Sequence, residues 1–476
     1  MIKTQYSKTI KGVLWSAIER FSVQAIQFIL SIILARLVMP SEYGLIAMLS
    51  IFTAIAQCFI DSGFGNALIQ KQNRNEKDYS TVFYFNIVIA VILYITLYNL
   101  SPIIASFYNE PKLEIITKIT GLNLLISSFS IVQYARLTIN MDFKNLAKGS
   151  LLSVILGGIV GIYLAYKNFG VWALVVQGLI TNILNTVYLW ICTGWKPMLS
   201  FSYLSFKQLF SFGSKLLLSS FLHVVYINLY SLVIGKKYSA TDVGLYNRAF
   251  SLAQFPSSNI VSIITRVSYP AQCKIQNENK ELAIVFHQYL QMSCYIIFPL
   301  MVGLAVLAKP LILFLLGKNW EQAADILSIL CIAYMWYPIM VLNNQILNVK
   351  GRTDYFLKAE LIKKMIALII LISTLPFGLT PLCLGVLIYN IIDMSIIIYY
   401  SKKVILTSYL IQIKKIAPHF LLAISMGLSV ACISLNLTNL FLKLMLGTIG
   451  GILHYIILSH IFHFKELKFI FSILKR

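Results

Sequence analysis

The sequence predicts an all-α integral membrane protein, on three observations. Of its 476 residues, 58% are hydrophobic and only 12% are charged, whereas soluble globular domains are about 25% charged. Apolar segments of roughly 20 residues recur along the chain, the length that a helix needs to cross about 30 Å of hydrocarbon. The alternating segments of about ten residues that mark a membrane β-barrel do not occur. Since a bilayer forces the backbone to satisfy its own hydrogen bonds, the spans are predicted to be helices.

The apolar segments number about 14, and the connections between them are too short to hold a folded soluble domain. The first segment is predicted to be retained, because its apolar run is longer than a signal-peptide core and no small-residue cleavage pattern follows it. The predicted spans are 13–38, 43–70, 80–107, 112–138, 146–166, 169–194, 208–235, 241–268, 284–316, 322–349, 358–377, 380–401, 415–436 and 439–463.

The basic residues predict the topology. The net charge is +22, with 39 Lys and Arg against 17 Asp and Glu, but the cations are not clustered as a nucleic-acid-binding face would require. With the N-terminus placed inside, 27 of them fall in inner segments and 8 in outer segments. This asymmetry satisfies the positive-inside rule. It predicts a multi-pass protein of the bacterial inner (cytoplasmic) membrane with both termini in the cytoplasm.

A short internal repeat predicts two related halves. The segment Leu34–Leu45 (LARLVMPSEYGL) aligns at an offset of 200 residues with Ile234–Leu245 (IGKKYSATDVGL). Each places a basic residue at a helix end, then Ser-Glu or Thr-Asp as a helix cap, then Gly-Leu. We therefore expect an N-lobe of six helices at 1–195, a C-lobe of six at 205–403 and two further helices at 414–463. Because an even number of spans separates the repeats, the lobes are expected to share one orientation in the membrane.

Eight segments along nearly the whole chain carry a family resemblance. They are YGLIAMLSIF…FIDSGFGNALIQ (43–70), STVFYFNI (80–87), ARLTINMDFKNLA (135–147), FGVWALVVQGL (169–179), VGLYNRAFSLAQFP (243–256), RVSYPAQCKIQ (266–276), AVLAKPLILFLLGKNW (305–320) and NVKGRTDYFLK (348–358). In this order they resemble the polysaccharide flippases of the MOP superfamily, specifically the WzxC-like branch. The resemblance implies 14 helices around a central cavity. It also implies translocation of an undecaprenyl-pyrophosphate-linked oligosaccharide from the cytoplasmic to the outer leaflet, in contact with membrane lipid and with polymerase and glycan-assembly partners.

Charged residues within spans are the candidate binding residues. An ionisable residue at bilayer depth costs roughly 2.5–3.5 kcal/mol on insertion scales, so it normally faces a bundle interior or water. Arg20 in the first span and Arg248 in the eighth look like the cavity arginines of superfamily members that flip lipid-linked sugars, and a guanidinium suits phosphate because its planar fork binds two oxygens. Lys215 in the seventh span is a third candidate. An ion pair with the neighbouring Glu19, or snorkelling, is the alternative for Arg20.

Polar and acidic residues complete the predicted site. Asn247 and Asn259 flank a polar run in the eighth span, which would be costly against lipid and is expected to line water. Asp393 in the twelfth span and Asp61 in the second are candidates for coupling transport to Na⁺ or H⁺, with capping as the alternative for Asp61. The sequence shows no metal-ligand or CxxC spacing, and we expect neither a metal site nor a cofactor.

Two other classes of function compete with a flippase. A multidrug or small-molecule cation antiporter of the same superfamily should have an acidic cavity, whereas the charges in these spans are mostly basic. A membrane polysaccharide polymerase or glycosyltransferase usually carries a large outer loop or paired carboxylates there. The outer loops here are short, and the first offers only Glu42. The sequence therefore favours a transporter over an enzyme.

Overall fold

The computed structural model describes residues 22–61 and 64–474, without the side chains at positions 211, 212, 215, 216, 218, 219, 222, 223 and 470–474. Within these ranges every regular element is a helix, which confirms the predicted all-α class. Among the described residues, ten helical segments are long and apolar enough to cross a membrane. The helix at 22–37 is shorter, and α10, α11 and α16 are not among these ten, so the count of 14 stays a prediction.

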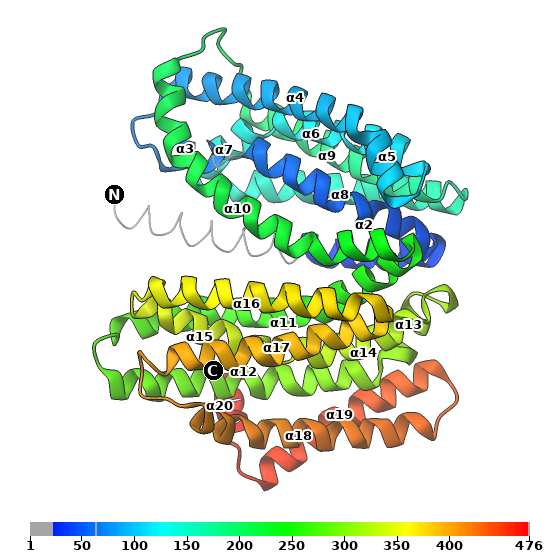
Figure 1. Ribbon diagram of the computed structural model, residues 1–476, viewed down its shortest axis with the longest axis vertical. Coiled ribbons are helices and arrows are strands. Elements are labelled where there is room, and N and C mark those ends of the chain that lie inside the picture. The colour runs from blue at the N-terminus through cyan, green and yellow to red at the C-terminus, as the bar shows by residue number, and fades with distance from the viewer. Residues whose placement is uncertain (1–21, 62–63, 475–476) are drawn as a thin grey trace. The chain divides into compact units, whose positions relative to one another are not determined.

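The chain forms two compact units, Met1–Gly244 and Leu245–Arg476, coloured blue to green and green to red in Figure 1. In the first unit α8 packs along α9, and α10 packs along α2. Its helices are Ser22–Leu37, α2 (Pro40–Asp61), α3 (Phe64–Gln70), α4 (Glu76–Tyr108), α5 (Lys112–Thr120), α6 (Leu122–Ser128), α7 (Ile131–Ile139), α8 (Phe143–Tyr166), α9 (Val171–Thr193), α10 (Tyr203–Lys237) and the start of α11 (Ala240–Lys274).

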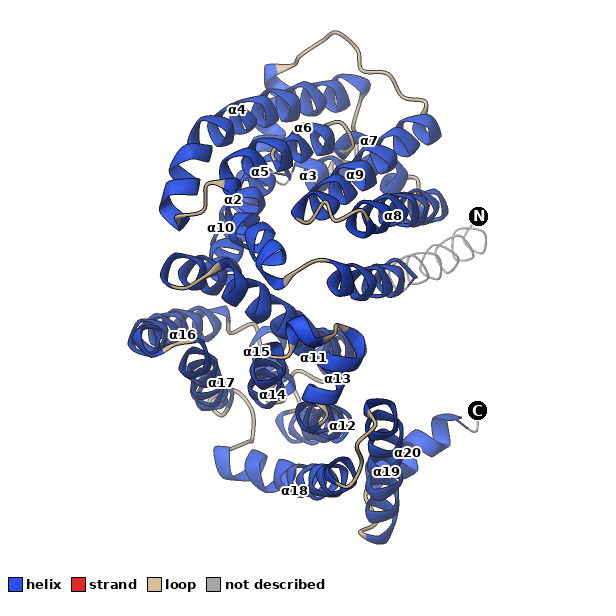
Figure 2. Cartoon of the chain, turned by 90° about the vertical axis from the view of Figure 1, so that its right-hand side faces the viewer, coloured by secondary structure: helices blue, strands red, loops and turns tan. Residues whose placement is uncertain are grey.

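The second unit holds the rest of α11 and all the later helices. Here α18 packs against both α12 and α19, and α17 packs against α14 and α16, as Figure 2 shows. The elements are α12 (Asn279–Val306), α13 (Ala308–Leu315), the 3₁₀ turn η1 (Lys318–Trp320), α14 (Ala323–Tyr334), α15 (Tyr337–Val349), α16 (Thr353–Thr374), the 3₁₀ turn η2 (Leu375–Phe377), α17 (Leu379–Ser401), α18 (Tyr409–Leu435), α19 (Leu440–Ile461) and α20 (Lys465–Leu474). The two units are defined by their compactness, whereas the two lobes are predicted from an internal repeat. The predicted lobe boundary at 195–205 therefore stays a prediction.

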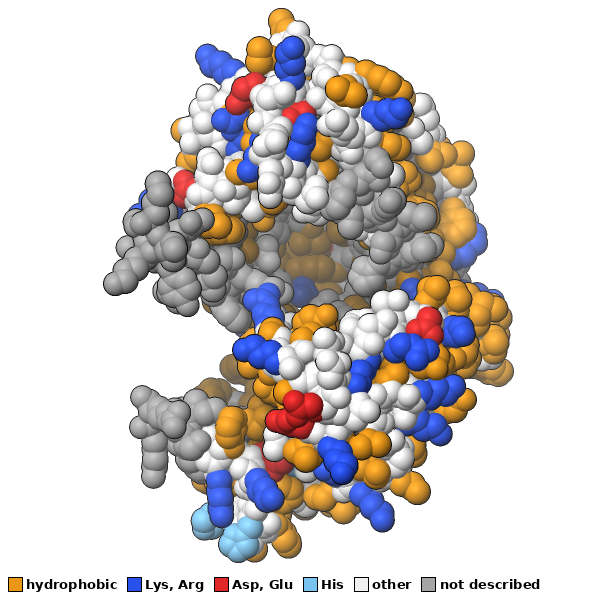
Figure 3. Space-filling model, turned by 90° about the vertical axis from the view of Figure 1, so that its left-hand side faces the viewer, with side chains coloured by type: hydrophobic (Ala, Val, Ile, Leu, Met, Phe, Trp, Pro, Cys, Tyr) orange, Lys and Arg blue, Asp and Glu red, His pale blue; other side chains and the backbone are white. Residues whose placement is uncertain are grey.

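Side-chain capping and ion pairs order one end of the first unit. Asn75 caps α4, since its side chain accepts from the Asp78 amide at 2.9 Å while the Asp78 carboxylate accepts from the Asn75 amide at 2.9 Å. The buried Asp78 also pairs with Lys71 at 2.8 Å. Nearby, Arg136 pairs with Glu76 at 3.0 Å. Figure 3 looks at the ends of the helices where the predicted inner loops lie, and on each unit Lys and Arg side chains are more prominent there than Asp and Glu.

The predicted repeat corresponds to a reciprocal contact between two helix starts. Pro40 and Gly44 begin α2, and Ala240 and Gly244 occupy the equivalent positions of α11, 200 residues later. A Cβ atom on Gly44 would overlap the carbonyl of Ala240, and a Cβ atom on Gly244 would overlap the carbonyl of Pro40. Each glycine therefore allows the close approach of the other helix's backbone. This crossing explains the Gly-Leu pair of the repeat. Helix capping alone does not account for that pair.

Replacing either glycine of this crossing by alanine is expected to destabilise the protein. Because the added methyl group meets backbone and cannot be accommodated by rotating a side chain, G44A and G244A should each cost about 1–3 kcal/mol, seen as a lower Tm in detergent. G178A is the matched control, since a Cβ on this α9 glycine has open space. Tm values for G44A and G244A equal to that of G178A would contradict the crossing.

Candidate functional site

Arg248, on α11, rests on an aromatic ring in the second unit. Its guanidinium carbon lies 5.5 Å from the ring centre of Trp320, and Trp320 in η1 is fully buried. A guanidinium over an indole face is a favourable cation–π arrangement. The contact fixes the position of the cation, while the side chain itself is only half-buried. An arginine held in this way is suited to receiving an anion.

The polar run that follows Arg248 has two faces. The Asn259 amide donates to the Phe255 carbonyl at 2.8 Å, and the Ser251 hydroxyl donates to the Asn247 carbonyl at 2.8 Å, so both bonds stay within α11. Ser257 is fully buried and donates to the Tyr334 carbonyl of α14 at 3.0 Å. The expectation that the whole run lines water is therefore wrong for Ser257, which faces a packed neighbour.

The other two predicted cations cannot be placed beside Arg248. Arg20 lies outside the described residues. Lys215 lies in α10, but its side chain is outside the described set. Their role as phosphate ligands therefore stays a prediction.

Asp393 belongs to a buried cluster of charges between α16 and α17. The Lys363 ammonium lies 3.1 Å from the Asp393 carboxylate and 2.5 Å from the Glu360 carboxylate. Lys363 is only 3% exposed and Asp393 only 8%. Lys363 is one of the 27 cations that the sequence assigns to inner segments, because it stands beside Lys364 and close to Lys358. Its position three residues after Glu360 on a helix was the available signal that the two side chains pair.

Asp61 has a different environment. It is the last residue of α2 and is exposed, and its carboxylate accepts from the Gln57 amide at 2.9 Å. The Gln57 side-chain carbonyl in turn accepts from the Ser127 hydroxyl at 3.0 Å. Gln57 also lines a cavity of about 490 Å³ in the first unit, together with other neutral polar side chains such as Ser50 and Asn123. Asp61 therefore stands at the end of a neutral, hydrogen-bonded polar path.

Two buried amide networks in the second unit were not predicted from the sequence. Gln345 on α15 donates to Ser268 at 2.9 Å and to Gln272 at 2.7 Å, both on α11. Asn343 and Gln412 exchange hydrogen bonds at 3.0 Å between α15 and α18. Isolated Asn and Gln within apolar segments were the available signal, since a buried amide needs a partner. These bonds tie the polar side of α11 and the start of α18 to α15.

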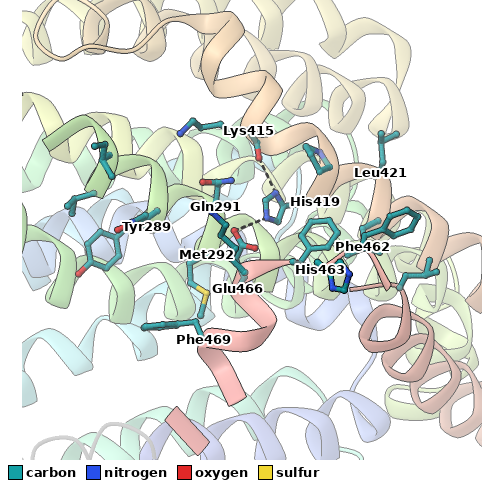
Figure 4. Close-up of a pocket in the computed structure, with 18 of the residues that line it drawn as sticks. Tyr289, Gln291, Met292, Lys415, His419, Leu421, Phe462, His463, Glu466 and Phe469 are labelled. Carbon is teal, nitrogen blue, oxygen red and sulfur yellow. Dashed lines mark hydrogen bonds and ion pairs between the residues drawn. The ribbon is translucent and has the colours of Figure 1, made fainter. Parts of the chain in front are cut away.

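A second, larger cavity of about 1650 Å³ lies among α12, α18, α19 and α20 (Figure 4). Its lining includes Lys415, His419 and Glu466 but neither Arg248 nor Asp393.

The comparisons with known proteins fit this architecture. Residues 33–325 match the family model described as "Polysaccharide biosynthesis protein". The chain belongs to this family. The polysaccharide flippase resemblance seen in the sequence is thereby confirmed.

Individual relatives extend over most of the chain. The teichuronic acid biosynthesis protein TuaB of Bacillus subtilis is 29% identical, covering 72% of this chain and 72% of its own. The lipopolysaccharide biosynthesis protein WzxC of Escherichia coli is 25% identical, covering 84% and 82%. The structure of the lipid II flippase MurJ superposes with a TM-score of 0.75 at 18% identity, covering 95% of this chain and 99% of that one. The last likeness establishes a shared fold.

Removing the Lys363 ammonium is expected to destabilise the second unit. K363M would leave the buried Asp393 carboxylate without its cation, a change that typically costs about 3–5 kcal/mol, so the Tm in detergent should fall steeply. The double variant K363M/D393N removes both charges and should recover part of the loss. K358M, an exposed lysine on the same helix, is the control. Equal Tm values for K363M and K358M would show that the pair contributes nothing.

Proposed function

We propose that this protein is a flippase that moves an undecaprenyl-pyrophosphate-linked oligosaccharide from the cytoplasmic to the outer leaflet by alternating access, for surface polysaccharide biosynthesis. The observation that carries the proposal is the family match over residues 33–325. Relatives named for teichuronic acid and lipopolysaccharide biosynthesis support it. So does the fold shared with a protein named as a lipid II flippase.

The cargo explains why cations stand in the spans. A diphosphate cannot cross hydrocarbon without compensating charge, and arginine binds phosphate oxygens through two parallel N–H groups. In this proposal Arg248 and Arg20 bind the diphosphate and Lys215 adds a further positive charge. Asn247 and Asn259 offer amide groups to the sugar. Trp320 holds the Arg248 guanidinium in place before the ligand arrives.

We propose Asp393 as the coupling residue, with a proton as the coupling ion. The Lys363 ammonium already supplies a cation to the Asp393 and Glu360 carboxylates. Two carboxylates with one ammonium carry an excess negative charge, which protonation can relieve without moving a metal ion. Asp61 is the second candidate, because it lies at the end of a polar path in the first unit.

The membrane and partners follow from the same proposal. Because the proposed cargo is assembled on the cytoplasmic face, the protein would act in the bacterial inner membrane. The excess of cations in the predicted inner segments supports cytoplasmic termini. After translocation the oligosaccharide becomes available to a polymerase and to glycan-assembly proteins on the outer side. The protein then acts as a carrier and leaves the bonds of the cargo unchanged.

Deleting the gene tests the proposed cargo. A strain that lacks the protein should lose the surface polysaccharide and accumulate the undecaprenyl-linked oligosaccharide in its membranes, quantified by lipid extraction and mass spectrometry. Accumulation of unextended lipid carrier would instead indicate a polymerase or glycosyltransferase. Hypersensitivity to cationic drugs with a normal surface glycan would indicate a cation antiporter.

Arg248 should be essential to translocation. R248A removes the guanidinium that binds the diphosphate, and losing one partner of a desolvated charge pair costs about 2–5 kcal/mol, so glycan export should fall by about 100-fold. R20A is expected to behave alike, whereas R248K should retain partial export because it keeps the charge. Surface-glycan complementation is the readout, with membrane-inserted protein measured by immunoblot. Full activity of both R248A and R20A, at normal protein levels, would contradict the phosphate role.

Asp393 should determine the dependence on the proton gradient. D393N removes the proposed proton-binding carboxylate, so flipping in proteoliposomes should no longer respond to an imposed pH gradient, while exchange without a gradient persists. D61N is the comparison variant, since Asp61 is the competing candidate. A gradient response that survives in D393N but is lost in D61N would transfer the role to Asp61.

A further inference from the structure

The segment that connects α9 to α10 carries a group of exposed large apolar side chains. Between Gly194 and Ser202 the chain is not helical, and this loop stands out from the helices of the first unit in Figures 1 and 2. The exposed side chains are those of Met198, Leu199, Phe201, Tyr203 and Leu204. Leu199 is 97% exposed, so the rest of the unit scarcely covers it. Single exposed apolar residues are ordinary, whereas a contiguous group indicates a surface that contacts a partner or a membrane.

Two hydrogen bonds hold this connecting segment (residues 194–204) against α4. The Met198 amide donates to the Ser80 hydroxyl at 2.9 Å. The Ser202 amide donates to the Thr81 hydroxyl at 3.0 Å. Both hydroxyls belong to buried residues in the second turn of α4, where the predicted span 80–107 begins. The apolar side chains are therefore held level with the first membrane-spanning turn of α4, and not beyond the end of the helix.

The start of the connecting segment is polar and lies one turn closer to the end of α4. The Trp195 indole N–H donates to the Glu76 carboxylate at 2.6 Å, and Arg136 pairs with the same carboxylate at 3.0 Å. Glu76 is the first residue of α4. Two exposed lysines, Lys196 and Lys207, flank the apolar group. Indole rings and lysine ammonium groups are typical of the headgroup layer of a membrane, so this end has the composition of an interface.

The backbone of the connecting segment is suited to a shallow position in a bilayer. Irregular backbone does not enter the hydrocarbon core against lipid, because its polar groups would lose their hydrogen bonds. Besides the two bonds to α4, the Ser200 amide donates to the Met198 carbonyl at 2.7 Å, and Pro197 has no N–H to satisfy. The side chains can therefore reach the edge of the hydrocarbon while the backbone stays at the level of the headgroups.

We propose that the connecting segment is a membrane anchor, which inserts the apolar side chains of residues 198–204 into the leaflet on the predicted inner side. Their depth beside α4 selects lipid as the occupant, since a soluble partner would have to enter the edge of the bilayer to reach them. The flanking lysines would lie among the headgroups, as in other segments that lie in a membrane interface. Because the segment is bonded to α4, the anchor would hold the end of α9 and the start of α10 at a fixed depth. The proposal does not depend on the identity of the cargo.

Hydroxyl-radical footprinting of the unaltered full-length protein tests this proposal. The purified protein is reconstituted in vesicles of phosphatidylethanolamine and phosphatidylglycerol, and methionine oxidation is measured by mass spectrometry. Met198 and Met141 are each 48% exposed on the protein, and Met141 is the matched control because it stands in the turn between α7 and α8, which is predicted to face the inner water phase. Met198 should be oxidised about tenfold more slowly than Met141, since burial of its side chain in lipid keeps it from the radical. Equal oxidation of the two methionines would overturn the proposal.

Photo-crosslinking in cells identifies what covers the connecting segment. The photoreactive amino acid p-benzoylphenylalanine takes the place of Leu199 in one variant and of Asn73, in the exposed turn before α4, in the control variant. Irradiation should join position 199 to phospholipid, with much less lipid adduct at position 73. An adduct between position 199 and a protein, including a second copy of this chain, would contradict the anchor. Equal yields of lipid adduct at the two positions would contradict it as well.

Discussion

The cost of placing a charge in hydrocarbon is the constraint on which this architecture depends. An ionised side chain at bilayer depth needs a partner or contact with water, and the structure shows how several are accommodated. Lys363 is held between two carboxylates, and Arg248 lies over the buried ring of Trp320. His419 pairs with Glu466 at the start of the C-terminal helix. Lys363 is buried in its ion pair, and Arg248 is half-buried. The His419–Glu466 contact attaches α20 to α18.

The Lys363–Asp393 ion pair and the stacked Arg248 differ in how far they are buried. Lys363 and Asp393 are buried and form an ion pair, and Glu360 adds a second carboxylate beside the same ammonium. Arg248 keeps part of its surface exposed and stacks on the ring of Trp320. The proposed transport cycle assigns coupling to the Lys363 cluster and cargo binding to Arg248.

Much of the fold could be predicted because membrane helices follow simple rules of length and hydropathy. Within residues 22–61 and 64–474, the predicted spans coincide closely with the helices. Breaks such as the one between α14 and α15 fall inside a predicted span, with Pro338 in the first turn of α15. The 200-residue repeat was visible in the sequence. The helix crossing that it forms was not, because the approach of Gly44 to Ala240 depends on tertiary packing. Lys363 was missed because hydropathy counts its charge and cannot detect its pairing with Asp393. Ser257 was placed against water because a polar run does not reveal which of its members face a neighbouring helix.

The central claim is that fixed positive charge carries a diphosphate across the bilayer, and flipping by the purified protein in proteoliposomes tests it most directly. The flipping rate of a polyprenyl-diphosphate oligosaccharide is compared with that of an uncharged polyprenyl glycoside bearing the same sugars. The account predicts rapid protein-dependent flipping of the diphosphate and little of the uncharged glycoside. Equal rates for the two lipids would show that the sugars or the tail, and not the diphosphate, are recognised.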